Sequence, residues 1–413
     1  MGRGGEQRST VAVLDPEGPP GVAFIRSLGR RGVTMVAYSE SKAVAGRWSR
    51  AVARHEHSPG VHDAERYLAW LTDMIGSGAI THVAPTSDYT VYATAIARQR
   101  AGVQVPAGGV SFEAAWACLH KPTFDRVAAK VGFAPVPAAL PTSIDEAIVA
   151  AAALGYPLVI KPRTHIGVGI GRGAIVHDEH ELRTHFARAE VDPAHGEALA
   201  LDPDLAWPML QRFIASAGLE VVSVSGCLSA GGAAMHVGHT SKLAQWPPGL
   251  GVGSLFESRR PEVHTELALK VVEQALGAGL FELELAIDRH TGEAWPIDLN
   301  PRAYGQVALE VARGNDLPGA WFELATGRHL EPFAVRDPLP ELWVSAMAHH
   351  PGALIGLLRG PQRRAELRRL RTLLGRPRVG SVADRRDPIP GLVMGLQMLR
   401  HPGSLVRPFL RRR

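Results

Sequence analysis

Two short segments late in the chain combine acidic and amide side chains at strand-like spacing. Residues 281–288 read Phe-Glu-Leu-Glu-Leu-Ala-Ile-Asp, and residues 296–302 read Pro-Ile-Asp-Leu-Asn-Pro-Arg. They predict two strands joined by a polar connection, with Glu284 facing Asp298 and Asn300, because alternate strand residues share a face. Carboxylate and amide oxygens suit Mg²⁺, which usually takes one or two protein carboxylates plus substrate phosphates. The pair therefore predicts a divalent-cation site beside a phosphoryl group.

The acidic strand leaves one choice of ligand open. Glu282 and Glu284 lie on the same face by alternation, so either could hold the ion. We favour Glu284, because Leu-Ala-Ile-Asp follows it as a regular strand exit. Mn²⁺ is an alternative to Mg²⁺.

A lysine and a glycine-rich loop further up the chain could bind the phosphates that such an ion serves. Residues 156–161, Tyr-Pro-Leu-Val-Ile-Lys, predict a strand with Lys161 at its exit. The glycines that follow are Gly167, Gly169, Gly171 and Gly173. They would let backbone N–H groups approach phosphate oxygens without obstruction by a Cβ atom. No Gly-Lys-Ser/Thr follows them, so this is no Walker A loop, and a flexible surface hairpin is the alternative.

The segments on either side of this loop supply further candidate residues. Lys121 lies between two predicted helices, at 111–119 and 123–131. Residues 208–214 predict another strand exit, whose backbone could meet an adenine edge while Glu220 reaches a ribose hydroxyl. A hydrophobic linker strand is the alternative for 208–214.

The first hundred residues alternate between strand-like and helical patterns. We expect strands at 10–15, 33–38 and 82–85, and helices at 22–31 and 64–76. This order predicts a parallel sheet, in which ligands sit beyond the carboxyl ends of the strands. The stretches 15–18 (Asp-Pro-Glu-Gly) and 86–88 (Thr-Ser-Asp) occupy those ends. They are candidates for the substrate pocket, with turn chemistry and helix capping as the alternative.

Taken in order, these parts resemble the ATP-grasp superfamily of ligases over residues 119–327. The shared parts are Lys121, the strand ending at Lys161, the glycine-rich loop, residues 211–214, the acidic strand and residues 298–302. The resemblance implies an α/β protein in three parts. These are an N-terminal Rossmann-like pre-ATP-grasp domain at 1–115, a two-subdomain α+β ATP-grasp domain at 116–330, and a basic C-terminal extension at 331–413.

The resemblance also implies which residues bind the nucleotide. Lys121 and Lys161 would contact ATP and its phosphates, and the glycine-rich loop would close over them as a lid. The adenine pocket would be lined by Gln211, Arg212, Phe213 and Ile214. Arg212 departs from the family pattern, in which an acidic residue is frequent, so the adenine contacts would rely on backbone groups.

Metal and catalytic roles follow from the same resemblance. Mg²⁺ would be held by Glu284, Asp298 and Asn300, although the family usually has glutamate where this chain has Asp298. Arg302 would stabilise charge on the transferring phosphoryl group. Lys242, in the segment between the adenine and metal strands, would face the substrate carboxylate or the phosphates.

The implied activity is that of a carboxylate–amine ligase acting on an amino-acid-like substrate. ATP would convert the carboxylate to an acylphosphate, and an amine would then displace phosphate. A carboxylase or carbamoyl-phosphate-type ligase is one alternative, although the sequence contains no Met-Lys-Met biotin-carrier segment. A non-catalytic nucleotide-binding protein is the other.

Composition and charge exclude several other classes of protein. The chain has 413 residues, 46% of them apolar, and no apolar run as long as a membrane span. With no signal-peptide pattern at the N-terminus and two isolated cysteines, Cys118 and Cys227, we expect a cytoplasmic protein without disulfides or zinc. The net charge of +5 comes largely from arginines after residue 358, with few aromatics among them. This indicates a solvated basic face, or contact with an acidic partner or membrane surface, and not nucleic acid. A homodimer is an alternative to a monomer.

Overall fold

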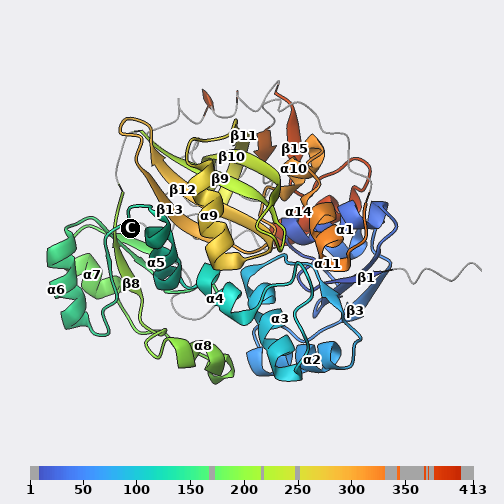
Figure 1. Cartoon of the computed structure of the whole chain (residues 1–413), viewed down its shortest axis with the longest axis horizontal. Helices are drawn as coiled ribbons and strands as arrows, with labels where there is room; N and C mark the ends of the chain where they lie inside the picture. Colours follow the sequence, from blue (N-terminus) through green and yellow to red (C-terminus); the bar gives the residue numbers. More distant parts are fainter. Residues whose placement is uncertain are drawn as a thin grey trace, which may run out of the picture.

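The computed structural model describes residues 9–166, 173–214, 218–246, 252–330, 342–344, 367–368, 371 and 376–400. Their strands form three sheets, which fall within residues 10–83, 138–212 and 219–380. Figure 1 shows the smallest sheet, with α6 and α7, standing apart from the other two. The residues predicted to bind nucleotide and metal lie on the smallest and the central sheet or next to them.

The N-terminal sheet is parallel and has the strand order β3-β2-β1-β4. Its strands are β1 (Thr10–Val13), β2 (Thr34–Ser39), β3 (Arg54–His57) and β4 (His82–Val83). The helices beside it are α1 (Pro19–Arg30), α2 (Ala64–Gly76) and α3 (Asp88–Ala101), and η1 (Gly46–Trp48) precedes β3. Short apolar runs such as Val11–Val13 are fully buried between the helices, as expected for strands of a parallel sheet. This confirms the predicted α/β class of the domain.

The smallest sheet has the order β5-β8-β6-β7 and is antiparallel. It contains β5 (Ala138–Ala139), β6 (Leu158–Lys161), β7 (Ala174–Val176) and β8 (Met209–Arg212), with α6 (Ile144–Leu154) and α7 (Glu179–His185) beside it. Its separate core includes Leu158, Ile160 and Leu210, which pack against the alanines of α6. Two short elements, η2 (Pro193–His195) and α8 (Gly196–Leu201), precede β8. The glycine-rich loop, with Gly167, Gly169 and Gly171, lies outside the described residues.

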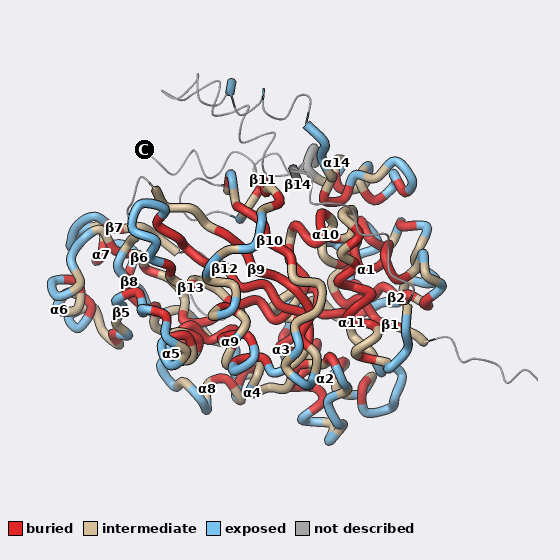
Figure 2. The backbone as a smooth tube through the Cα atoms, turned by 45° about the horizontal axis from the view of Figure 1, so that its top comes forward, coloured by how far each residue is buried: buried red, intermediate tan, exposed pale blue. Residues whose placement is uncertain are grey.

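The central sheet has the order β13-β12-β9-β10-β11-β14-β15. Its strands are β9 (Leu219–Leu228), β10 (Ala234–Trp246), β11 (Val252–Ser258), β12 (Gly279–Asp288), β13 (Ala294–Asn300), β14 (Leu342–Val344) and β15 (Arg378–Gly380). Contacting helices are α4 (Phe112–Leu119), α5 (Lys121–Val131), α9 (Thr265–Leu276), α10 (Val307–Arg313) and α11 (Leu317–Thr326). Figure 2 shows that β9 and β12 are buried over most of their length. One hydrophobic core joins this sheet to the N-terminal domain, and it includes Phe281 of β12 and Tyr92 of α3.

Residues from the predicted C-terminal extension pack onto both larger units. Strands β14 and β15 complete the central sheet, and α14 (Ile389–Arg400) packs Met394 against Val22 of the N-terminal domain. Asp387 is buried and accepts hydrogen bonds from Arg26 Nε (2.8 Å) and Ser49 Oγ (2.7 Å). The arginines near residues 363 and 411 lie outside the described residues, so contact with an acidic partner or membrane surface stays a prediction. In the described part of the chain no helix is long and apolar enough to cross a membrane.

Candidate active site

The hairpin of β12 and β13 places the predicted acidic residues opposite one another. Glu284 pairs with Asp298 across the strands, and Glu282 pairs with Asn300. Directly opposed residues on one face have Cβ atoms about 4.5–5.5 Å apart, close enough for both pairs to share one ligand. Asn300 Nδ2 donates to Glu282 Oε2 at 3.1 Å. The structure therefore brings all the predicted metal ligands together on one face.

The two glutamates differ in their surroundings. Glu282 is 3% exposed, and its two oxygens accept hydrogen bonds from Asn300 Nδ2 and from Gln306 Nε2 (2.6 Å). Burial, followed by repulsion from Glu284, raises the pKa of Glu282 to about 7. Glu284 instead contacts an ammonium group, because Lys242 Nζ lies 2.7 Å from its Oε1. These contacts favour Glu284 as the ligand, since Glu282 is already held by two amide donors.

Lys242 reaches Glu284 from β10. Burial opposes the charge of its ammonium group, but the Glu284 carboxylate outweighs burial, and the pKa of Lys242 is raised. Lys242 therefore stays charged beside the predicted metal ligands. Its predicted role toward a substrate carboxylate or phosphate remains a prediction.

Lys121 and His165 bind the other carboxylate of the hairpin. Lys121 Nζ contacts both Asp298 Oδ1 and His165 Nε2, and His165 Nε2 lies 3.1 Å from the same oxygen. Burial alone would raise the pKa of Asp298, but the charge of Lys121, followed by that of His165, holds it well below its usual value. Lys121 begins α5, and its backbone N donates to Arg163 O at 2.8 Å, which fixes α5 beside the end of β6. Asp298 is thus ionised and surrounded by cations.

Lys161 lies at the end of β6 and differs from the other lysines of the site. Burial, followed by repulsion from Lys121, lowers the pKa of Lys161 to about 8. Within the described residues its ammonium group has no hydrogen-bond or ion-pair partner. A partly buried ammonium without a counterion favours an anionic ligand such as phosphate.

Arg302 connects the hairpin to the N-terminal domain. Its guanidinium makes a bidentate pair with Asp88, with Nε–Oδ1 at 2.6 Å and Nη2–Oδ2 at 2.9 Å, and Nη2 also donates to Asn300 Oδ1 at 3.0 Å. Burial opposes the charge on Arg302, but Asp88 outweighs it and raises the pKa of the guanidinium. Asp88 is the first residue of α3, and His165 Nδ1 lies 3.7 Å from its Oδ2. The site therefore combines α3 of the N-terminal domain with residues at the ends of β6 and β13.

The predicted adenine residues lie further from this cluster. Gln211 pairs with Val159 and Arg212 with Leu158, whereas Lys161 at the other end of β6 pairs with Met209. Arg212 is exposed, and its Nε donates to Leu154 O at 3.1 Å. Phe213 N donates to Pro157 O, and Ile214 follows as the last described residue of this segment. Their adenine contacts stay a prediction.

Glu220 lies on β9 away from the metal ligands. Its Oε2 is 2.9 Å from Arg289 Nε and 3.1 Å from Arg259 Nη2. The predicted contact with a ribose hydroxyl is therefore in competition with two arginines, and it too stays a prediction.

The donor set of the hairpin fits a magnesium ion. In the described ranges no three His, Cys, Asp or Glu side chains are grouped to hold a metal, so the set depends on Asn300 beside the carboxylates of Glu284 and Asp298. Two carboxylates and an amide, all hard oxygen donors, are within what Mg²⁺ takes from proteins when phosphates supply the rest.

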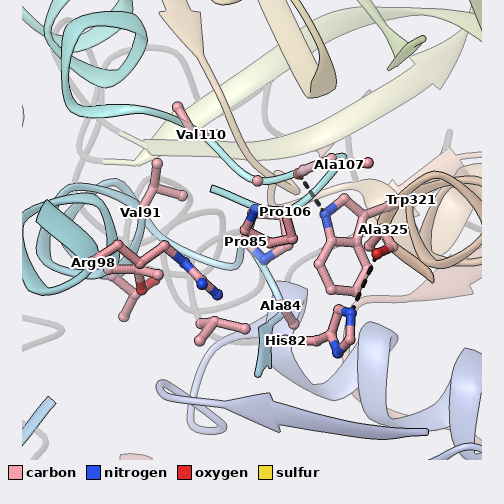
Figure 3. Close-up of a pocket in the computed structure, with 15 residues that line it drawn as sticks. His82, Ala84, Pro85, Val91, Arg98, Pro106, Ala107, Val110, Trp321 and Ala325 are labelled. Carbon is pink, nitrogen blue, oxygen red and sulfur yellow. Dashed lines mark hydrogen bonds between the residues drawn. The ribbon is translucent and has the colours of Figure 1, made fainter. Parts of the chain in front are cut away.

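A small cavity lies apart from this site (Figure 3). It has a volume of about 30 Å³ and lies between α3 and α11, lined by residues such as Thr94 and Trp321. His82 Nε2 lies 3.2 Å from Ala325 O, and Trp321 Nε1 donates to Gly108 O at 2.9 Å, so the walls are bonded to one another. The volume holds about one water molecule, which could bond to the unpartnered Thr94 hydroxyl. It is too small for a substrate.

Comparison with known proteins agrees with this arrangement. A family model for the ATP-binding domain of the carbamoyl-phosphate synthase L chain matches residues 120–200, which include Lys121, Lys161 and His165. The biotin carboxylase domain dimer of Hydrogenobacter thermophilus 2-oxoglutarate carboxylase, in complex with MgADP, ADP and bicarbonate, superimposes with a TM-score of 0.59. It is 17% identical, and the match covers 80% of this chain and 72% of that one. The chain therefore has an ATP-grasp fold.

Two further proteins are similar to this chain. The L-amino acid ligase of Bacillus licheniformis matches with a TM-score of 0.56 at 15% identity, over 79% of this chain and 75% of that one. The carbamoyl phosphate synthase large chain of Halobacterium salinarum is 29% identical over 212 residues, which cover 48% of this chain and 18% of that protein. This chain thus spans less than a fifth of the relative's length.

Sequence reasoning missed two features of the site. His165 lies between Lys121, Asp298 and Asp88, and nothing in its spacing separates it from any loop histidine. Asp88 was expected in a substrate pocket at the end of β4, which stays a prediction; its pairing with Arg302 was not expected. An acid just after a strand end, together with an arginine just after the metal hairpin, is the signal that could have suggested the pairing of Asp88 with Arg302.

Proposed function

We propose that the protein is an ATP-dependent carboxylate–amine ligase that forms an amide through an acylphosphate and releases ADP and phosphate. The observation that carries the proposal is the position of Lys121 and Lys161 opposite the hairpin that holds Glu284, Asp298 and Asn300. Cations for phosphates thus face oxygen ligands for a metal. The similarity to an L-amino acid ligase supports an amino-acid-like substrate for this proposal.

The chain's own residues would divide the work as follows. Lys161 would hold a phosphate oxygen, and Lys121 would move its ammonium group from Asp298 toward the nucleotide when ATP enters. Glu284, Asp298 and Asn300 would hold Mg²⁺, which supplies charge neutralisation between the phosphates. Arg302, fixed by Asp88, would face the phosphoryl group as negative charge develops on it.

The reaction then has two bond exchanges. A substrate carboxylate oxygen attacks the γ-phosphorus of ATP, and the bond to the ADP oxygen breaks. The amine nitrogen attacks the acyl carbon of the product, and the carbon–oxygen bond to phosphate breaks. Holding three reactants together in one cleft removes an entropic cost of up to about 7–11 kcal/mol in favourable systems.

A screen for ADP release tests the proposal. The protein would be incubated with Mg²⁺-ATP and pairs of carboxylates and amines, and hydroxylamine would trap acylphosphates as hydroxamates. Asp298→Ala is the blank, and Glu293→Ala, an exposed acid in the connection after β12, is the matched control. We expect carboxylate-dependent ADP release in the parent and the control only. Equal ATP hydrolysis by parent and blank under every pair would refute the assignment.

A second candidate function is a bicarbonate-using or carbamoyl-phosphate-type ligase. It is supported by the relative from Halobacterium salinarum and by the biotin carboxylase structure with bicarbonate. The same screen with bicarbonate as the carboxylate, with and without ammonia, separates the two. Nucleotide binding without any substrate-dependent ADP release would instead indicate a non-catalytic protein, and light scattering would distinguish monomer from homodimer.

A further inference from the structure

Asp202, which lies outside the proposed reaction residues, binds two side chains at the junction of the small sheet with α5. Its Oδ2 lies 3.1 Å from His120 Nε2, and Arg163 Nη1 lies 3.1 Å from Oδ1 and 3.2 Å from Oδ2. The three side chains are only 12%, 7% and 4% exposed, in the order Asp202, His120, Arg163. Burial alone would raise the pKa of Asp202, but the hydrogen bond from His120, followed by the charge of Arg163, lowers it. We call these three residues the Asp202 cluster.

The two residues that bind this carboxylate are close neighbours of the nucleotide lysines in the sequence. His120 directly precedes Lys121, the first residue of α5. Arg163 follows Lys161, the last residue of β6, by two positions. The backbones of the two segments also pair, because Lys121 N donates to Arg163 O at 2.8 Å. An antiparallel bridge joins His120 and Thr164 beside it. The cluster therefore lies where both lysines leave the backbone.

The Asp202 cluster crosses a boundary between two parts of the molecule. Lys121 lies on α5, which packs against α9 and against β13 of the central sheet. Lys161 lies on β6 of the small sheet, and Asp202 lies between α8 and β8, the strand that pairs with β6. Figures 1 and 2 both show α5 at the boundary between the small sheet and the rest of the molecule. The carboxylate thus bonds one residue from each part.

Holding the two lysines close together is electrostatically unfavourable. Asp298 provides a counter-charge for Lys121, but Lys161 has no ion-pair partner within the described ranges. Repulsion from Lys121 is, after burial, the main cause of the lowered pKa of Lys161. Without nucleotide, other contacts must oppose their separation. Hydrogen bonds in which a partner is ionised are roughly twice as strong as neutral ones, and the Asp202 cluster supplies such bonds at this junction.

Further contacts fix each member of the cluster in place. Trp116 stacks on the ring of His120, with ring centroids 4.3 Å apart and 14° between the planes. Arg163 Nη2 donates to two backbone carbonyls that follow β5. Asp204 N donates to Asp202 Oδ1 at 3.0 Å. Side chains locked by packing and by further hydrogen bonds can hold neighbouring groups at a defined separation, which an exposed ion pair cannot do.

We propose that Asp202 is a positioning residue for nucleotide binding, which holds Lys121 and Lys161 at the separation at which both reach the phosphates of ATP. The assignment rests on the nucleotide-binding step of the ligase function proposed above. Loss of the cluster then weakens the contacts with phosphate and leaves those with the adenosine part unchanged. A cluster that served the fold alone would affect both parts of the nucleotide equally.

The test compares a ligand that carries phosphates with one that does not. The Kd of Mg²⁺-ATP would be measured by titration calorimetry at pH 7, and that of adenosine by competition, with circular dichroism confirming that each variant is folded. Asp202→Asn removes the charge. His120→Phe removes only the imidazole hydrogen bonds and keeps a ring on Trp116. Because it leaves the pair of Arg163 and Asp202 intact, His120→Phe keeps the test valid even if Asp202→Asn fails to fold.

Two controls and one conservative variant complete the set. Asp204→Asn removes an exposed acid two residues along the chain. Glu197→Gln breaks the ion pair of Glu197 with Arg100 (2.7 Å), which ties α8 to α3 of the N-terminal domain without touching the cluster. His120→Gln provides an amide N–H group that can donate to Asp202 in place of the imidazole.

We expect the Kd of Mg²⁺-ATP to rise about tenfold in Asp202→Asn and about threefold to tenfold in His120→Phe, as for weakened hydrogen bonds to a charged group. The Kd of adenosine should stay within about twofold of the parent in both, which is below 0.5 kcal/mol by the conversion of about 1.4 kcal/mol per tenfold. Both controls should bind ATP like the parent, and His120→Gln should bind it more tightly than His120→Phe.

The other outcomes overturn the assignment in distinguishable ways. Parental ATP affinity in the folded variants would refute the positioning role and leave nucleotide binding by the protein standing. An equal loss of affinity for ATP and adenosine would also refute it, because the cluster would then serve the fold alone. If the parent does not bind Mg²⁺-ATP, the proposed function itself fails, and the assignment falls with it.

Discussion

Lys161 should make the nucleotide-free protein less stable and the nucleotide complex more stable. Burial and Lys121 lower its pKa from 10.5 to about 8, a difference that corresponds to roughly 3 kcal/mol at most. Because the side chain is partly exposed, solvent screening reduces this to about 1–2 kcal/mol. At pH 7 the Lys161 side chain is charged in both the folded and the unfolded chain, so the folded state is destabilised by the full amount estimated above, about 1–2 kcal/mol.

Lys161→Met removes the charge and keeps a chain of similar length. We expect it to stabilise the protein without nucleotide by about 1–2 kcal/mol, which raises the Tm of a chain of 413 residues by about 1–2 °C. The parent should gain stability between pH 8 and 10.5, where the folded state has released the proton and the unfolded state still binds it. The variant should show no such gain.

The effect on ATP should have the opposite sign. Losing a charge-assisted contact to phosphate weakens binding by about 1.5–3 kcal/mol, or tenfold to a hundredfold. Thermal unfolding at pH 7 with and without Mg²⁺-ATP measures both effects at once. Lys161→Arg, which keeps the charge, and Lys130→Met, which removes an exposed lysine from α5, are the controls.

One result would refute this reasoning about Lys161. If Lys161→Met lowers the Tm without nucleotide and still shows the parental shift with ATP, the lysine serves the fold and not a phosphate.

Three further predictions concern the acids of the site. Glu284→Gln should destabilise the protein by about 3–5 kcal/mol, because it leaves the buried Lys242 without its counterion, and thermal unfolding at pH 7 will show it. Glu282→Gln should leave the free energy of unfolding at pH 8 unchanged or raise it. The raised pKa of the Glu282 carboxyl makes the parent lose stability as pH rises from 4.5 through about 7, and glutamine does not ionise. An equal loss of stability in Glu284→Gln and Glu282→Gln would contradict this. Asp88→Asn should lower the free energy of unfolding by about 2–4 kcal/mol at pH 7. Arg302 outweighs burial and lowers the pKa of Asp88, so the difference in stability between parent and variant should shrink as pH falls below about 4.

Local sequence patterns predicted much of the fold. The helix expected at 64–76 is α2 with the same bounds, because Asp63 caps it and its apolar residues recur at helical spacing. Strand β3 could not be predicted. Its residues, Arg-His-Glu-His, are mostly exposed, and they form a strand only because they pair with the end of β2 at the edge of the sheet.

The candidate site was predictable as a set of residues but not as a set of contacts. Order along the chain indicated Lys121, Lys161 and the acidic hairpin, because strand exits and alternation are local properties. The contact of Lys121 with Asp298 joins residues far apart in the chain and depends on how α5 docks beside the hairpin. No local pattern contains that information, and the same holds for His165.

The contact between Arg26 and Asp387 determines where the protein can be truncated without loss of its fold. Motif boundaries suggest a fragment ending near residue 330, which would keep every residue of the proposed catalytic set. Such a fragment would lose the three hydrogen bonds that Arg26 makes to Val382 and Asp387, and would expose Val22 where Met394 now packs. A truncated product is therefore expected to aggregate or unfold although its active site is intact, and recombinant work should retain the chain through α14.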